Sequence, residues 1–156
     1  MAHLERKHAS FVVARWNLLL LTTELITAYL NANYYILEKE QFKFQIGAYS
    51  NDFENLFKQY NVNNGSFISA YNPKSEPTIK IQNENKHRQL KNRLLKDSLL
   101  FLEAVSTDPS GNWPPEYGFL VLGINKNKAI QFGISLCQNA IVYIDFKAVP
   151  ELILVD

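Results

Sequence analysis

The sequence has few of the residues from which covalent cross-links or metal sites are made. Among its 156 residues there is one cysteine, Cys137. A single cysteine can form no internal disulfide and no cysteine-built zinc site, which fits a reducing compartment, so we expect a cytoplasmic protein. No clustered metal-ligand motif stands out elsewhere, and we predict neither a metal nor a cofactor.

The chain also lacks an excess of one charge. It carries 16 Lys and Arg residues against 15 Asp and Glu residues, a formal net charge of +1. This balance gives no long-range attraction to nucleic acid or to an anionic membrane. We therefore expect neither partner, unless a local basic patch provides one.

Long apolar runs are missing as well. A membrane-spanning helix needs roughly 20 apolar residues, and near the N-terminus Arg15 and Asn17 interrupt the only candidate. No small-x-small cleavage site follows it, so it does not resemble a signal peptide. We expect a helix over residues 9–30, with residues 1–24 as a helical extension and residues 25–156 as one domain. The alternative is a start codon assigned too early, which would leave the first two dozen residues poorly packed.

What the chain does have is enough apolar material for a core. The hydrophobic content is 47% and the aromatic content 13%, which is ordinary for a globular domain of this length. Ser50 or Asn51 can cap one helix and Asn125 can cap another, and a third helical pattern covers residues 79–96. Strand patterns cover residues 33–37, 42–46, 66–71, 99–105, 117–124, 140–144 and 152–155. We predict a single α+β domain with a mixed sheet of five to seven strands, covered by three helices.

Two of the strand patterns are continuously apolar. Residues 119–122 and 140–144 contain no alternating polar positions, which is typical of strands that are buried on both faces. We therefore expect these two strands to be central in the sheet and to neighbour each other.

The most distinctive stretch is the Tyr-Asn-Pro-Lys-Ser-Glu-Pro segment at residues 71–77. Pro73 and Pro77 restrict the backbone, so we expect the side chains of Asn72 and Ser75 to point in fixed directions. A ligand-binding loop needs such restriction. An ordinary tight turn needs it too, because Asn and Ser bond to nearby backbone amides in turns. Both interpretations stay open.

The helix at residues 79–96 is rich in cations. Six of its residues are Lys or Arg, but on a helical wheel they scatter around the axis. A nucleic-acid interface would gather them on one side, so the pattern favours a solvated helix. His87 shares the apolar side with Leu90 and Leu94, with Leu95 nearby, and we predict a hydrogen-bonded core histidine there. Glu84 and Arg88 are one turn apart and are expected to pair.

Candidates for catalysis are few. Glu116 lies beside Trp113 and a buried strand, where a carboxyl can be desolvated and its pKa raised, so it is the best candidate general acid or base. A lone carboxylate is more often a structural hydrogen-bond acceptor. Cys137, at the end of an apolar helix, is a weaker candidate nucleophile with His87 as its only nearby base.

Four ordered motifs carry a resemblance to a known family. They are residues 69–75 (Ser-Ala-Tyr-Asn-Pro-Lys-Ser), then Glu84 and Asn85 with Arg88 and Leu90, then Trp113, Glu116 and residues 119–123 (Phe-Leu-Val-Leu-Gly), and finally residues 138–142 (Gln-Asn-Ala-Ile-Val). From Leu25 to Phe146 the chain resembles a bacterial family catalogued only as domain of unknown function 3293. The order of the motifs is more specific than any one of them.

The resemblance implies a set of recurrent polar positions but no chemistry. These positions fall on Asn72, Ser75, Asn85, Arg88, Trp113, Glu116 and Gln138. The chain departs from the family in two places. It has Tyr117 and Gly118 where the family usually has Pro-Ser, and Leu136 and Cys137 where the family has Phe-Gly. A hydroxyl that took part in a shared site would be lost at position 118.

Three of these residues lie beside predicted strand ends, where a sheet can present polar groups to a ligand. If the ends meet, Asn72 and Gln138 can bond amide-like edges and Trp113 can stack on a planar ring. Arg88 can take an anionic group. We therefore expect a site for a small polar ligand, such as a nucleotide-like molecule, formed by Asn72, Ser75, Asn85, Arg88, Trp113 and Gln138.

The alternative is a protein–protein interaction module without a small-molecule site. Exposed tyrosines such as Tyr34, Tyr49 and Tyr60, the apolar N-terminal segment, or the edge strand near Leu152 would then form the contact. A third and weaker hypothesis is an enzyme that uses Glu116 as acid or base.

Overall fold

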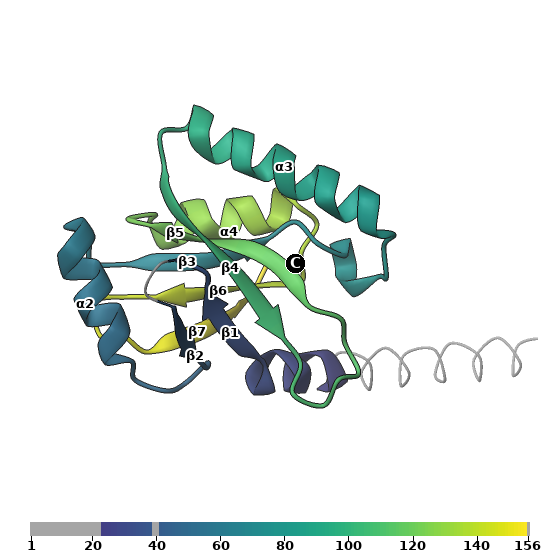
Figure 1. Ribbon diagram of the computed structural model, residues 1–156, viewed down its shortest axis with the longest axis horizontal. Coiled ribbons are helices and arrows are strands. Elements are labelled where there is room, and N and C mark those ends of the chain that lie inside the picture. Colours follow the sequence, from purple (N-terminus) through teal and green to yellow (C-terminus); the bar gives the residue numbers. More distant parts are fainter. Residues whose placement is uncertain (1–22, 39–40, 156) are drawn as a thin grey trace, which may run out of the picture.

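A single sheet of seven strands organises the computed structural model of the chain, which describes residues 23–38 and 41–155 (Figure 1). The strand order is β2-β1-β4-β5-β3-β6-β7. The strands are β1 (Asn33–Ile36), β2 (Phe42–Phe44), β3 (Gly65–Ser69), β4 (Leu100–Thr107), β5 (Glu116–Leu122), β6 (Ala140–Ile144) and β7 (Pro150–Leu154). The predicted α+β class is confirmed. The predicted mixed sheet is wrong, because every pairing between these strands is antiparallel.

The position of β3 contradicts one prediction about the order of the strands. It lies between β5 and β6, so the two continuously apolar strands are not neighbours as predicted. All five residues of β3 are buried, including its two serines. The Ser66 hydroxyl donates to the Val142 carbonyl at 2.8 Å, and the Ser69 hydroxyl donates to the Tyr117 carbonyl at 2.7 Å. Since both hydroxyls are satisfied by adjacent strands, polar residues are tolerated at the centre of the sheet.

Helices cover both faces of the sheet. On one face, α2 (Asn51–Tyr60) packs Phe53 and Phe57 into the cluster that contains Tyr34 and Leu120. On the other face lie α3 (Lys80–Lys96) and α4 (Lys126–Ser135), which Figure 1 shows side by side along the top of the view. These helices confirm the three that were predicted. None of the helices within the described residues is long and apolar enough to cross a membrane.

The predicted helix caps are partly confirmed. Asn125 accepts a hydrogen bond from the Lys128 amide at 2.8 Å, as an N-cap residue does. Ser50 occupies the N-cap of α2 without a side-chain bond. Residues 23–31 are helical, which agrees with the end of the helix predicted over residues 9–30. The rest of that helix, with Trp16 and Leu20, lies outside the described residues.

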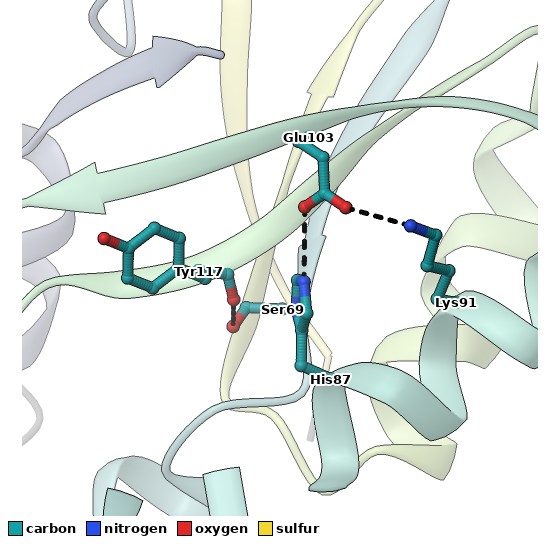
Figure 2. Close-up of polar contacts among 5 residues, drawn as sticks. All are labelled: Ser69, His87, Lys91, Glu103 and Tyr117. Carbon is teal, nitrogen blue, oxygen red and sulfur yellow. Dashed lines mark hydrogen bonds and ion pairs between the residues drawn. The ribbon is translucent and has the colours of Figure 1, made fainter. Parts of the chain in front are cut away.

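Helix α3 presents His87 to the sheet (Figure 2). The His87 ring stacks on Phe119 with centroids 4.3 Å apart, and its Nε2 lies 3.3 Å from Glu103 Oε2. Lys91 Nζ lies 3.4 Å from the other oxygen of Glu103. The predicted hydrogen-bonded core histidine is thus confirmed, although the ring is only partly buried.

Two other expectations for α3 are wrong. Glu84 pairs with Lys80 at 3.7 Å, while the guanidinium of Arg88 donates to Asn85 instead of to Glu84. Leu95 is exposed rather than near the core. The charged side chains of a solvated helix have several partners within one turn, so spacing alone does not select one of them.

Gly118 of β5 is required by close packing. A Cβ atom added there would lie 2.5 Å from the Ile68 carbonyl oxygen and 3.0 Å from the Phe67 ring. A serine at this position would meet the same backbone atom. The departure from the family pattern at position 118 therefore matches the close approach of β3.

We predict that Gly118→Ala destabilises the fold by about 2–4 kcal/mol, because β3 and β5 must separate or strain to admit the methyl group. Urea unfolding followed by far-UV circular dichroism measures this loss. Gly65→Ala is the matched control, since its Cβ would lie 3.3 Å from the Val121 carbonyl oxygen and require a smaller shift. Equal effects of the two substitutions would contradict the prediction.

Candidate functional site

The antiparallel pairing brings several strand ends to one rim of the sheet. β3 runs antiparallel to both β5 and β6, so the end of β3 lies beside the start of each. The end of β4 and the start of β1 reach the same rim, where Ser106 of β4 lies opposite both Tyr34 and Glu116. The expectation that the strand ends next to Asn72, Trp113 and Gln138 meet is confirmed.

The loop after β3 has an unusual backbone. Asn72, Lys74 and Ser75 all have positive φ, at 43°, 56° and 58°. Non-glycine residues seldom adopt this conformation, which costs of order 1 kcal/mol or more for each residue. The short helix η1 (Pro73–Ser75) lies within this loop. Such a conformation persists only where surrounding contacts hold it.

One set of those contacts joins Asn72 to Asn83 of α3. The Asn72 amide N–H donates to Asn83 Oδ1 at 2.9 Å, and Asn83 Nδ2 donates to Asn72 Oδ1 at 2.9 Å. Asn72 Oδ1 also accepts from the Thr78 amide at 3.0 Å, and Asn72 Nδ2 donates to Glu116 Oε1 at 3.0 Å. Both asparagines are buried. The loop, the start of α3 and the start of β5 are therefore fixed to one another.

A second set of contacts comes from the segment before β6. Gln138 Nε2 donates to the Tyr71 carbonyl at 3.0 Å, and the Cys137 carbonyl accepts from the Lys74 amide at 2.7 Å. Asn139 Nδ2 donates to the Ser75 hydroxyl at 3.0 Å. These bonds connect the loop to the segment between α4 and β6, in addition to its bonds with α3.

The Ser75 hydroxyl also reaches the N-terminal helical segment. It lies 2.9 Å from the hydroxyl of Tyr29, and the Tyr29 carbonyl accepts from the Tyr34 hydroxyl at 3.3 Å. Tyr34 is buried, so its prediction as an exposed contact residue is wrong. Residues 23–31 are thereby placed across the rim.

A small pocket, here called the rim pocket, lies under this helical segment. Its volume is about 50 Å³. An open groove of about 690 Å³ adjoins it and shares Ala28, Asp108 and Trp113 with it. The residues that line the rim pocket are Leu25, Ala28, Tyr29, Ala32, Tyr34, Ser75, Ser106, Thr107, Asp108, Trp113, Pro114 and Glu116.

Asp108 fixes the loop that carries Trp113. Its carboxylate accepts hydrogen bonds from the backbone amides of Ser110, Asn112 and Trp113, each at 3.0 Å, and from the Ser110 hydroxyl at 2.7 Å. These bonds lower the pKa of the Asp108 carboxyl, with the Ser110 hydroxyl making the largest contribution. The loop that carries Trp113 is therefore fixed, and Figure 1 shows this loop, between β4 and β5, beside the helical segment of residues 23–31.

The inner wall of the rim pocket contains a carboxyl with a perturbed pKa. Burial raises the pKa of Glu116 above its usual 4.5, and the hydrogen bond from Asn72 opposes this shift only in part. Burial is also the main cause that raises the pKa of Tyr34, with Tyr29 and Glu116 adding to it. A carboxyl that protonates above its usual range and faces a pocket can bind a donor or transfer a proton.

The seven residues singled out in the sequence take three different positions. Ser75, Trp113 and Glu116 line the rim pocket. Asn72 and Gln138 are buried behind it and support the loop. Asn85 and Arg88 lie on the exposed side of α3, bonded to each other.

Sequence reasoning missed Asn83, Tyr29 and Ser106. Asn83 had a detectable signal, because it continues the buried stripe of α3 one turn before His87, with Leu90 and Leu94 beyond. Asn85, two positions later, falls on the opposite side. Ser106 follows directly after the strand predicted over residues 99–105, and its role depends on the cross-strand register.

Neither a metal centre nor a cysteine site is built in this region. Among residues 23–38 and 41–155, no group of three or more His, Cys, Asp or Glu side chains is placed to hold a metal ion. Cys137 is exposed and has a φ of 55°, with its carbonyl bonded to Lys74. His87 is held by Glu103 on α3's side of the sheet.

Comparison with known proteins gives one finding. Residues 68–141 match the model of the family described as "Protein of unknown function (DUF3293)", which confirms over these residues the resemblance seen in the motifs. No curated protein and no solved structure matches the chain. The matched range contains Asn72, Asn83, Trp113 and Glu116, whereas Tyr29 and Tyr34 lie outside it.

We predict that Asn83→Ala destabilises the protein by about 2–4 kcal/mol, because the buried backbone N–H of Asn72 loses its acceptor and Asn72 Oδ1 loses one of its two donors. Asn85→Ala is the matched control on the same helix, and its exposed position predicts a change within about 0.5 kcal/mol. Thermal and urea unfolding of both variants measure the difference. A harmless substitution of Asn83 would show that the asparagine pair does not hold the loop.

We also predict an effect of pH at Glu116. A raised folded-state pKa means that the folded protein keeps a proton that the unfolded chain releases, so the free energy of unfolding falls as pH rises from 4.5 through the folded-state pKa. Glu116→Gln removes this pH-dependent fall in the free energy of unfolding, and the Gln side-chain oxygen can still accept the hydrogen bond from Asn72. The variant should be more stable than wild type at pH 7, and the difference should shrink towards pH 4.

Denaturant unfolding at both pH values checks this prediction. A Glu116→Gln variant that is clearly less stable than wild type at pH 7 would identify the carboxylate as a structural acceptor, and the prediction would be wrong.

Proposed function

We propose that this chain, which matches the DUF3293 family over residues 68–141, binds a small polar ligand in the rim pocket and its adjoining groove. One observation carries the proposal. Ser75, from the motif after β3, and Trp113 and Glu116, from the motif at the start of β5, line the same concavity although the two motifs are far apart in the sequence. Concave sites with an aromatic wall and a few convergent polar groups are the usual form of small-molecule sites.

The construction of the rim supports a binding role. Three residues of the Ser75 loop have positive φ, which is a costly backbone conformation. The buried side-chain amides of Asn83 and Gln138 hold this loop by hydrogen bonds. Backbone strain of this kind concentrates at functional sites, where it orients side chains before the ligand arrives. A plain connection between a strand and a helix does not require it.

The position of Arg88 bears on the chemical class of the ligand. Arg88 was expected to take an anionic group, but it lies on the exposed side of α3 and does not line the rim pocket. A phosphate would therefore find no arginine there. A ligand that stacks on Trp113 and offers N–H groups to Glu116 fits better, as the base of a nucleoside does.

An enzyme remains a second candidate because of Glu116. A pocket carboxyl with a raised pKa is suited to general acid or base catalysis. Binding is still the broader proposal, since a catalytic role for Glu116 also requires a ligand in this pocket. No nucleophile or metal is needed for either version.

The rival proposal, an interaction module, is supported by a different region. Phe146, Val149 and Leu154 are exposed near β7, the strand at one edge of the sheet. Edge strands with exposed apolar side chains can pair with another protein. A Leu154→Lys variant that changes the oligomeric state in light scattering would favour this role, and an unchanged monomer would count against it.

We predict that a nucleoside or a related planar polar compound raises the melting temperature of the protein by several degrees at ten times its dissociation constant. A thermal-shift screen with nucleosides and their monophosphates tests this, and the nucleosides should bind more tightly than the phosphates. Trp113→Ala should weaken binding about tenfold, since stacking on an aromatic side chain contributes about 1–3 kcal/mol.

Tyr49→Ala is the matched control, because Tyr49 is an exposed aromatic residue that lines neither the rim pocket nor the groove. It should leave binding unchanged. Binding that survives Trp113→Ala intact would remove the proposed function, and a complete absence of binding across the screen would exclude a nucleoside-like ligand.

A further inference from the structure

We propose that the rim pocket recognises a positively charged nitrogen, so that the ligand is an organic cation such as an amine or a guanidinium compound. This inference rests on the proposed function, because it names the chemical class of the ligand for the same pocket. It is drawn from the charges, the hydrogen-bond donors and the aromatic groups that line the pocket and its groove.

The charge of the lining side chains has one sign. Glu24 lines the groove, Glu116 lines the rim pocket and Asp108 lines both. Among the described residues that line either concavity, none is Lys or Arg. An anionic group would be repelled there, whereas a cation would be attracted by carboxylates inside a partly enclosed space of reduced dielectric constant.

Three hydrogen-bond donors at or behind the wall of the rim pocket are already used inside the protein. Tyr34 is only 3% exposed, and its hydroxyl proton goes to the Tyr29 carbonyl. The Thr107 hydroxyl donates to the Asn33 carbonyl at 3.3 Å, and the amide of Asn72 donates to Glu116. The oxygens of Tyr34, Thr107 and Glu116 can therefore act as hydrogen-bond acceptors for a ligand. A ligand that supplies N–H donors matches these acceptor oxygens.

The aromatic residues favour the same class of ligand. Tyr29, Tyr34 and Trp113 line the rim pocket. The faces of aromatic rings attract ammonium and guanidinium groups, most strongly where water is excluded. A volume of about 50 Å³ accepts a head group of a few atoms, so the remainder of the ligand would lie in the groove against Thr27, Asn31 and Asn112.

Burial of Glu116 gives the inference a pH signature. The pKa of this carboxyl is raised because it is desolvated, and the hydrogen bond that it accepts among the described residues comes from the neutral Asn72 amide. A bound cation would favour the ionised form. Cation binding should therefore strengthen as pH rises through the folded-state pKa of Glu116, and should release a proton below it.

The test uses the full chain with agmatine and putrescine as cationic probes and 1,4-butanediol as a neutral probe of similar length. Isothermal titration calorimetry at pH 5 and pH 7 should show that the cations bind at least about tenfold more tightly than the diol, which is the range expected of a charge-assisted hydrogen bond. The affinity for the cations should be higher at pH 7 than at pH 5.

Two variants test whether the cation binds beside Glu116. Glu116→Gln should reduce the affinity for agmatine about tenfold and remove its pH dependence. Glu151→Gln is the control, because Glu151 is an exposed carboxylate on β7 that pairs with Lys126 and lines neither concavity. It should bind agmatine as wild type does. Loss of binding in both variants would indicate a non-specific charge effect and would overturn the inference.

The remaining outcomes separate this inference from the proposed function. If a neutral nucleoside binds in a Trp113-dependent way and the cations do not, the choice of a cation is wrong and the ligand pocket stands. If neither class binds, or binding ignores both Trp113→Ala and Glu116→Gln, both proposals fail. A phosphate ester that binds more tightly than its parent alcohol would contradict the selection of a cation. It would leave the proposed ligand-binding function standing.

Discussion

The side chain of Asn72 is the point on which the rim of the sheet depends. Its oxygen accepts from the Thr78 amide and from Asn83, and its nitrogen donates to Glu116. One buried amide therefore connects the loop, the first turn of α3 and the first residue of β5. Because a buried amide left without partners costs about 1–3 kcal/mol, these three elements are constrained to move together. The positive φ of Asn72 itself is maintained by the same bonds.

A comparison of two carboxylates shows what this constraint produces. Glu103 and Glu116 lie on adjacent strands and face opposite sides of the sheet. Glu103 has His87 and Lys91 as partners on the α3 side, as Figure 2 shows. Glu116 has a neutral amide as its hydrogen-bond partner and sits beside the buried Tyr34. A carboxylate with a lysine beside it is an ordinary surface pair of modest stability. A desolvated carboxyl without a cation beside it lowers stability at neutral pH, and proteins tolerate such groups mainly where they serve a function.

Much of the fold was predictable because local patterns report local structure. The alternation of apolar and polar residues over 42–46 predicted β2, and the spacing of Leu90 and Leu94 predicted the buried side of α3. Asn125 predicted the N-cap of α4. The site was predictable only in part. The residue types and their position next to strand ends identified Ser75, Trp113 and Glu116. Whether a given asparagine lines a pocket or supports one depends on the direction of its side chain, and Asn72, Asn83 and Asn85 look alike in the sequence.

By itself, the sequence determined the helices, most of the strands and the polar motifs at their ends, because hydrophobic periodicity, proline and capping residues act over a few neighbouring residues. The tertiary structure alone decided that the sheet is antiparallel and that β3 lies between β5 and β6, since strand order depends on pairings across dozens of residues. That order places the end of β3 beside the starts of β5 and β6. The pocket exists for this reason, and its acidic, acceptor-rich wall is a property of the assembled rim that none of its segments has alone.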